Sequence, residues 1–181
     1  MQVHQTELSG VLVLEPRVFG DHRGFFFESY SHREFTKHGI DITWVQDNHS
    51  LSRQKGVLRG LHFQRPPHTQ TKLVRVVAGS VYDVVVDLRK DSRTFGTWQG
   101  FELSAREFKM LLVPKGFAHG FCTLEPDTEV LYKNDAFYEP SAEGGVRWND
   151  PGLDIPWPVA QPIISGKDAA LPLLKDLASP F

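Results

Sequence analysis

Residues 56–67, GVLRGLHFQRPP, have the composition of a buried β-strand with two polar interruptions. Most of the other side chains are apolar, and Pro66-Pro67 ends the run because proline cannot donate to a ladder. A buried strand that carries a guanidinium at Arg59 and an imidazole at His62 replaces packing with polar groups, as functional sites do. A single strand histidine is more often a hydrogen-bonded structural residue, so its interpretation depends on the rest of the chain.

Many short apolar runs surround this stretch, with turn residues between them. Runs at such close spacing, without alternating helices, predict an all-β antiparallel sandwich or barrel rather than a parallel α/β sheet. Val81–Leu88 is too apolar for a strand with only one buried face, which indicates burial on both faces of that strand. A turn is expected at Phe19–Gly24, and the predicted strands are Val11–Glu15, Phe25–Tyr30, Ile42–His49, Val57–Gln64, Lys72–Ala78, Ser80–Leu88, Thr97–Leu103, Lys109–Val113, Ala118–Leu124 and Thr128–Asp135.

Two short helices are expected outside the strand-rich region. The first covers His32–His38, with Ser31 as its N-cap. The second covers Lys167–Leu177 and is interrupted at Pro172. The segment 140–181 is rich in Pro, Trp and Gly, and we expect it to cover the barrel.

Length and composition exclude several classes of protein. A chain of 181 residues predicts one domain over residues 1–181. The net charge of -2 provides no basic field for nucleic acid or an anionic membrane. No apolar run approaches the roughly 20 residues of a membrane span, and the N-terminus lacks a signal-peptide pattern. The single cysteine, Cys122, is consistent with a reducing compartment, so the sequence predicts a cytoplasmic protein.

Residues 56–62 and 114–119 resemble the two halves of the cupin signature, which implies a cupin-type jelly-roll barrel. A metal-binding cupin has a second histidine where this chain has Gln64, and a carboxylate where it has His68 or Thr69. Zinc, iron and manganese require three or four N, O or S donors. The sequence therefore predicts no metal site.

Acid–base chemistry without a metal is the other interpretation of the polar strand residues. A histidine such as His62 can accept a proton, a tyrosine such as Tyr132 can donate one, and a lysine such as Lys72 can stabilise an oxyanion. Proton abstraction next to a carbonyl needs these three functions. Two of these residues also have a structural interpretation. Tyr132 could be a strand tyrosine with its hydroxyl at the barrel mouth, and Lys72 could be a solvated lysine at the start of a strand. Asp83 and Asp87 are interpreted as structural partners of arginines such as Arg75 or Arg89.

Seven blocks of sequence occur in an order that resembles the dTDP-4-dehydrorhamnose 3,5-epimerase family. The resemblance runs from about Leu14 to Asp168. It implies epimerisation of a dTDP-4-keto-6-deoxy-glucose at C3 and C5 to dTDP-4-keto-rhamnose, in dTDP-rhamnose biosynthesis. The blocks are Gln46–Asn48, Gly56–His62, Lys72–Val74, Val84–Arg89, Pro114–Phe121, Trp148–Pro151 and Ser165–Asp168.

The resemblance also implies roles for individual residues. His62 would be the base and Tyr132 the acid on the opposite face of the sugar. Asp168 would orient the His62 imidazole, and Lys72 would hold the C4 oxygen. Positions that match substrate-binding residues of the family are Phe19, Arg23, Glu28, Gln46, Asn48, Arg59, His119, Tyr138, Glu143 and Lys167.

Members of this family are dimers in which an N-terminal strand crosses to the partner, so Arg23 and Glu28 would serve the neighbouring site. No cofactor is expected, because the 4-keto group already supplies the electron sink. Alternatives are an epimerase that inverts only C3 or only C5, a non-catalytic sugar-nucleotide-binding cupin, and a metal-dependent cupin oxygenase or isomerase.

The spacing of Arg59 and His62 does not fit a regular strand with both side chains on one face. Both are expected to face the substrate, yet they lie three positions apart, and a regular strand would point them to opposite faces. Either the strand is irregular near Gly60, or Arg59 reaches the pocket around an edge or end of the sheet.

Overall fold

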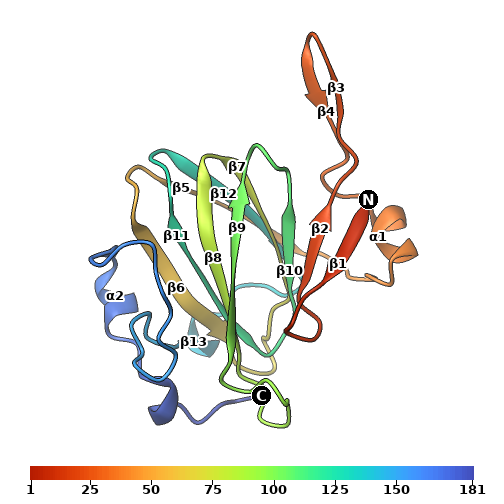
Figure 1. Ribbon diagram of the computed structural model, residues 1–181. Helices are drawn as coiled ribbons and strands as arrows, with labels where there is room; N and C mark the ends of the chain where they lie inside the picture. Colours follow the sequence, from red (N-terminus) through yellow and green to blue (C-terminus); the bar gives the residue numbers. More distant parts are fainter.

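Two antiparallel sheets face each other in the computed structural model, which describes residues 1–181 (Figure 1). The first sheet has the strand order β1 (Gln2–Gln5), β2 (Leu12–Glu15), β10 (Met110–Val113), β7 (Lys72–Ala78), β12 (Thr128–Asn134) and β5 (Gln46–Ser52). The second has the order β13 (Glu143–Gly145), β6 (Val57–Gln64), β11 (Phe117–Thr123), β8 (Ser80–Asp87) and β9 (Trp98–Ser104), with β14 (Ile163–Ile164) parallel to β6. The predicted all-β antiparallel jelly roll is confirmed.

The main core lies between the two sheets. Val74 and Val130 from the first sheet pack there with Val85 and Phe121 from the second. The neighbours of Val85 on β8, residues 84 and 86, belong instead to a cluster on the outer face of the second sheet. The expected burial of this strand on both faces is therefore observed, and it explains why apolar residues occupy both faces of the run.

The C-terminal segment packs on the outer face of the second sheet. Leu153, Trp157 and Phe181 join the outer cluster there. The Asp150 carboxylate accepts hydrogen bonds from the backbone N–H groups of residues 152, 153 and 174, which ties distant parts of the segment together. This packing brings α2 (Gly166–Ala169) beside β6 (Figure 1). The remaining short 3-10 turns are η1 (Pro140–Ala142) and η2 (Leu174–Asp176).

The N-terminal part extends the first sheet and then leaves it. The helix α1 (His32–Lys37) buries Phe35 against the outer face of that sheet. The hairpin of β3 (Phe19–Asp21) and β4 (Gly24–Phe26) projects away from the body of the molecule (Figure 1). Phe25 in the middle of β4 contacts the Phe108 ring, with ring centroids 4.7 Å apart.

Two of the predicted strands were wrong in detail. Phe25–Tyr30 is not one strand, because the chain forms the β3–β4 hairpin around residues 22 and 23 instead. Ile42–His49 begins too early, since β5 starts at Gln46, where pairing with Asn134 of β12 begins. Ile42 instead joins the outer cluster beside α1 as an irregular segment.

The C-terminal helix is also shorter than expected. Lys167–Leu177 contains α2 and η2 with extended chain between them around Pro172. Strand β1 was missed altogether, because its largely exposed residues show no buried face to recognise. No helix of the structure has the length and apolar character needed to cross a membrane.

Candidate active site

A cavity of about 500 Å³ opens between the two sheets near the C-terminal segment. Both sheets contribute to it, because inward-facing residues of β6 and β11 meet those of β7 and β12. Eight of the predicted site residues line it, namely Arg59, His62, Lys72, His119, Tyr132, Glu143, Lys167 and Asp168.

His62 and Asp168 form an ion-pair-like contact at this cavity. The Nε2 atom of His62 lies 2.8 Å from Oδ1 of Asp168, and the other carboxylate oxygen accepts from the Gly60 N–H at 3.1 Å. Burial alone would raise the pKa of Asp168, but these hydrogen bonds hold it below its usual range. The carboxylate thus fixes the His62 tautomer with hydrogen on Nε2 and leaves Nδ1 without a protein partner.

Two local interactions position the short helix α2, which carries Asp168. Ser165 is its N-cap, and the serine hydroxyl accepts a hydrogen bond from the Asp168 N–H at 3.0 Å. The preceding strand β14 pairs with the start of β6. Both interactions deliver Asp168 to the strand that bears His62.

Lys72 begins β7, on the sheet opposite His62. Burial lowers the pKa of its ammonium from 10.5 to about 8, and the charges of Asp83 and Glu143 partly offset this effect. When the buried Lys72 ammonium is protonated, its positive charge lies in a poorly solvated part of the cavity. It can therefore stabilise a negative oxygen more strongly than a solvated lysine does.

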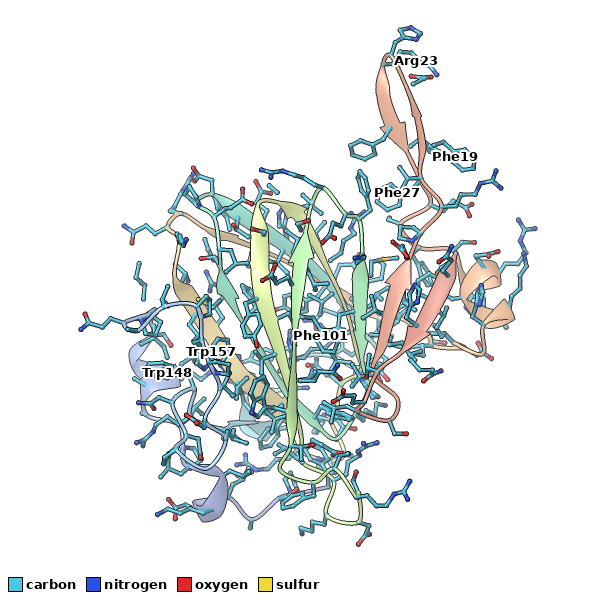
Figure 2. The ribbon with its side chains drawn as sticks, in the orientation of Figure 1. Phe19, Arg23, Phe27, Phe101, Trp148 and Trp157 are labelled. Carbon is cyan, nitrogen blue, oxygen red and sulfur yellow. The ribbon has the colours of Figure 1, made fainter.

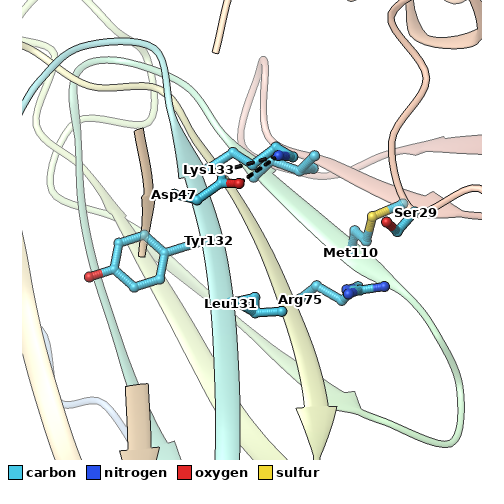
Figure 3. Close-up of a pocket in the computed structure, with 8 residues that line it drawn as sticks. Ser29, Asp47, Arg75, Met110, Leu131, Tyr132 and Lys133 are labelled. Atoms are coloured by element: carbon cyan, nitrogen blue, oxygen red, sulfur yellow. Dashed lines mark hydrogen bonds and ion pairs between the residues drawn. The ribbon is translucent and has the colours of Figure 1, made fainter. Parts of the chain in front are cut away.

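Tyr132 comes from β12, also on the sheet opposite His62. Its hydroxyl points away from Asp47, Arg75 and Lys133, which line a smaller hollow of about 170 Å³ (Figure 3). Burial raises the pKa of the Tyr132 phenol, so the group keeps its proton at neutral pH.

His119 pairs with a carboxylate that was interpreted differently from the sequence. Its Nε2 atom lies 2.9 Å from each carboxylate oxygen of Asp83, and both residues are buried. The expectation that Asp83 pairs with an arginine is wrong, whereas Asp87 does pair with Arg89, at 2.7 Å. The reason is register: His119 faces His62 across β11 and β6 and shares the inner face of the barrel with Asp83.

An irregularity in β6 resolves how Arg59 and His62 face one cavity. His62 is paired with His119 and Arg59 with Phe121, so β6 has one more residue than β11 between the two pairs. This extra residue returns Arg59 to the face of His62. Gly60 has a φ of 127°, and a Cβ there would lie 2.5 Å from the Cα of Gly120. Only glycine can occupy this position without displacing the neighbouring strand.

The mouth of the cavity is polar. The Tyr138 hydroxyl donates to Oε2 of Glu143 at 2.8 Å, and the Lys167 ammonium donates to the same oxygen at 2.5 Å. Gln46 accepts from the Tyr138 N–H at 2.9 Å and donates to the Asn48 side chain at 3.0 Å. Gln46, Asn48 and Tyr138 are therefore connected to the cavity through this network, although they do not line it.

Three predicted residues lie elsewhere. Phe19 and Arg23 belong to the projecting hairpin, far from the barrel interior (Figure 2). Glu28 borders a separate cavity of about 450 Å³ near α1, together with Phe19 and Phe26. Within a single chain these residues do not meet the His62 cavity.

Ser50 was missed as a site residue. Ser50 lines the cavity, and its buried hydroxyl has no hydrogen-bond partner. The alternation of Gln46, Asn48 and Ser50 along β5 was the available signal, since alternate residues share one face.

The residues at the cupin ligand positions do not suit a metal ion. His62 and His119 each contact a carboxylate through Nε2. The Gln64 amide is bound to backbone groups. No group of three His, Cys, Asp or Glu residues has the geometry of a metal site. The arrangement instead offers a base, an acid and a cation around one cavity, which suits proton transfer next to a carbonyl.

Known proteins resemble this chain in sequence and in fold. The family model for dTDP-4-dehydrorhamnose 3,5-epimerase matches residues 5–176. The chain is 55% identical over 176 residues to the dTDP-4-dehydrorhamnose 3,5-epimerase of Salmonella typhimurium, with 96% of each protein covered. The crystal structure of dTDP-4-dehydrorhamnose 3,5-epimerase from Bacillus anthracis, with TDP and PPi bound, has a TM-score of 0.94 at 55% identity, covering 96% of this chain and 99% of that one. The dTDP-6-deoxy-D-glucose-3,5-epimerase of Legionella pneumophila, in complex with dTDP-4-keto-L-rhamnose, has a TM-score of 0.91 at 45% identity, covering 96% and 93%.

Proposed function

The chain belongs to the dTDP-4-dehydrorhamnose 3,5-epimerase family, and from this premise we propose that it converts dTDP-4-keto-6-deoxy-glucose into dTDP-4-keto-rhamnose by inverting C3 and C5. The observation that carries the proposal is the position of His62 and Tyr132 on opposite sheets of one cavity. Inversion requires that a proton leaves one face of a carbon and another arrives on the opposite face. A base and an acid on facing sheets meet this requirement.

His62 is the base in this proposal. The 4-keto group acidifies the hydrogens on C3 and C5, and the free Nδ1 of His62 takes one of them as a proton. The Asp168 carboxylate then stabilises the imidazolium, because its charge lies 2.8 Å from Nε2. The electron pair of the broken C–H bond moves into the ketone and produces an enolate.

Lys72 stabilises the negative charge that develops on the C4 oxygen. A preorganised cation of this kind typically contributes a few kcal/mol. Tyr132 then donates its phenolic proton to the carbon from the other face, which restores the ketone with inverted configuration. His62 then releases its proton to solvent and Tyr132 takes one up from solvent, and the same steps at the second carbon complete the reaction. No cofactor has a role in these steps, because the substrate ketone accepts and returns the electron pair.

The nucleotide half of the substrate is assigned to the polar mouth. Arg59 has a planar guanidinium that matches diphosphate oxygens, and Lys167 adds a second positive charge. His119 is assigned to the sugar or phosphate, and Glu143, Gln46 and Asn48 supply further polar contacts. The half-exposed Tyr138 ring is placed to stack on the base.

We further propose that residues 1–181 form one domain that works as a cytoplasmic homodimer. The projecting hairpin exposes Phe19 and Phe26, at 51% and 69%, which is costly unless a partner covers them. Exchange of this segment would bring Phe19, Arg23 and Glu28 to the partner's cavity. Light scattering tests the dimer, and Arg23→Ala should raise KM while leaving the His62 cavity intact. A monomer of full activity would exclude the exchange.

The activity itself is tested by the product. Incubation with dTDP-4-keto-6-deoxy-glucose, followed by reduction of the ketone and NMR of the sugar, distinguishes two inverted centres from one. Two inverted centres support the proposal. Inversion at C3 or C5 alone would make the protein a single-centre epimerase, and binding without turnover would make it a sugar-nucleotide-binding cupin.

A further inference from the structure

Gln64 is a buried residue that the proposed chemistry does not use. It ends β6, two residues after His62, and only 5% of it is exposed. Alternate residues of a strand share a face, so Gln64 points to the same side of β6 as His62. A buried amide has two N–H donors and a carbonyl acceptor that require partners. The identity of these partners shows what Gln64 holds in place.

The hydrogen bonds of Gln64 hold the backbone on both sides of Tyr138. Its Nε2 donates to the carbonyl of Phe137 at 3.1 Å and to that of His68 at 2.7 Å. Its Oε1 accepts from the Glu139 N–H at 2.7 Å. Both peptide groups that flank Tyr138 are therefore bound to one rigid strand.

Tyr138 depends on these bonds because its ring has little packing of its own. The side chain is half exposed, and the neighbouring Phe137 is 69% exposed. The Tyr138 hydroxyl holds Glu143, which in turn binds the Lys167 ammonium. A shift of the backbone at residue 138 would therefore disturb two residues that line the cavity.

We propose that Gln64 is a positioning residue for substrate binding, which holds Tyr138 and Glu143 in the arrangement that binds the nucleotide half of the sugar nucleotide. This proposal rests on the proposed function, because it assumes a dTDP-sugar in the cavity. Gln64 itself does not touch the substrate. Disorder at the mouth is a cost of binding and not of the chemical step, so it raises KM and leaves kcat unchanged.

The test begins with Gln64→Met, which keeps the side-chain volume and removes all three hydrogen bonds. We expect KM for the sugar nucleotide and Kd for dTDP to rise together by about 5- to 50-fold, the loss of one or two net hydrogen bonds, with kcat within about twofold. Gln99→Met is the matched control. Its amide oxygen accepts from the Glu7 N–H at 3.2 Å outside the cavity, and both constants should stay unchanged.

A double-mutant cycle with Tyr138→Ala separates positioning from a general structural role. Gln64→Met should weaken dTDP binding much less in the Tyr138→Ala background than in the wild-type protein. An equal loss in both backgrounds, or an unchanged Kd in the single variant, overturns the proposal. If the Met variant does not fold, Gln64→Glu replaces it, since it keeps the acceptor for Glu139 and loses both donors.

Failure of the proposed function has a different signature. The wild-type protein would then leave the dTDP-4-keto sugar unchanged. Failure of the Gln64 proposal leaves the wild-type protein active and the Gln64 variants with normal KM.

Discussion

The His62 imidazole and the Asp168 carboxylate are 106 residues apart in the chain, yet Nε2 and Oδ1 lie 2.8 Å from each other. Asp168 also accepts the Gly60 N–H, so one carboxylate joins the strand of the base to the C-terminal segment. In the proposed reaction, the orientation and the charge of His62 both depend on this contact.

Asp168→Asn keeps the shape of the side chain and removes its negative charge. We expect kcat to fall roughly 10- to 100-fold with little change in KM, because a charge-assisted hydrogen bond to the imidazolium is lost. Steady-state kinetics at neutral pH measure this. A variant with kcat within twofold of wild type would show that Asp168 does not assist the base.

Lys72 should produce the alkaline limb of the pH profile. Its pKa is lowered to about 8 by burial, so its positive charge is lost as pH rises through about 8, and kcat/KM should fall there. Tyr132 does not cause this limb, because burial raises the pKa of its phenol. Asp83 raises the pKa of Lys72, so Asp83→Asn should move the limb to lower pH.

Asp127→Asn is the control for that shift. Asp127 pairs with Arg53 at the surface, and its removal should leave the limb in place. A limb that stays fixed in Asp83→Asn, or that moves to higher pH, would contradict the assigned role of Lys72.

Tyr132→Phe removes the proposed acid and keeps the ring that packs against the core. His62 and Lys72 remain, so enolate formation should continue and solvent hydrogen should still exchange into the substrate. Formation of the inverted product should fall at least about 100-fold, the usual contribution of a positioned acid. NMR in heavy water follows both processes at once. Parallel loss of exchange and inversion would assign Tyr132 to the first proton transfer instead.

Gly60→Ala should destabilise the fold through the irregular part of β6. The new Cβ would lie 2.5 Å from the Cα of Gly120, at a φ of 127° that alanine rarely adopts. We expect a loss of about 2–3 kcal/mol, which lowers Tm by roughly 4–12 °C for a chain of this size. Gly166→Ala is the matched control, because nothing lies within 4 Å of its added Cβ, and its Tm should be unchanged. Equal Tm values for the two variants would contradict the close approach at Gly60.

Much of the sheet could be predicted because its strands have distinct patterns. The bounds of β6 and β7 match the prediction, since glycine or proline marks an end of each strand and apolar residues fill the interior. Strand β1 has no such pattern, as its residues are largely exposed and only pair with β2. The start of β5 depends on its pairing with β12. The residues of a single sequence do not show which positions of two strands will pair.

The candidate site was predictable where the family resemblance supplied the residues and not where pairing decided their role. Nothing near Asp83 in the sequence indicates that it binds His119, because adjacent strands bring the two together. Gln64 was recognised only as a missing metal ligand, since the loop that it holds is distant in sequence. The shared face of Arg59 and His62 required the irregular register of β6, and sequence spacing alone predicted the opposite.

His62 is proposed to remove the protons from both carbons next to the ketone. The direct measurement is the reaction in heavy water with wild-type protein and His62→Ala, with the product read by mass and NMR. Solvent deuterium is expected at both C3 and C5 for wild type, and at neither carbon for His62→Ala. Inverted product without deuterium, or near-normal exchange in His62→Ala, would exclude His62 as the base.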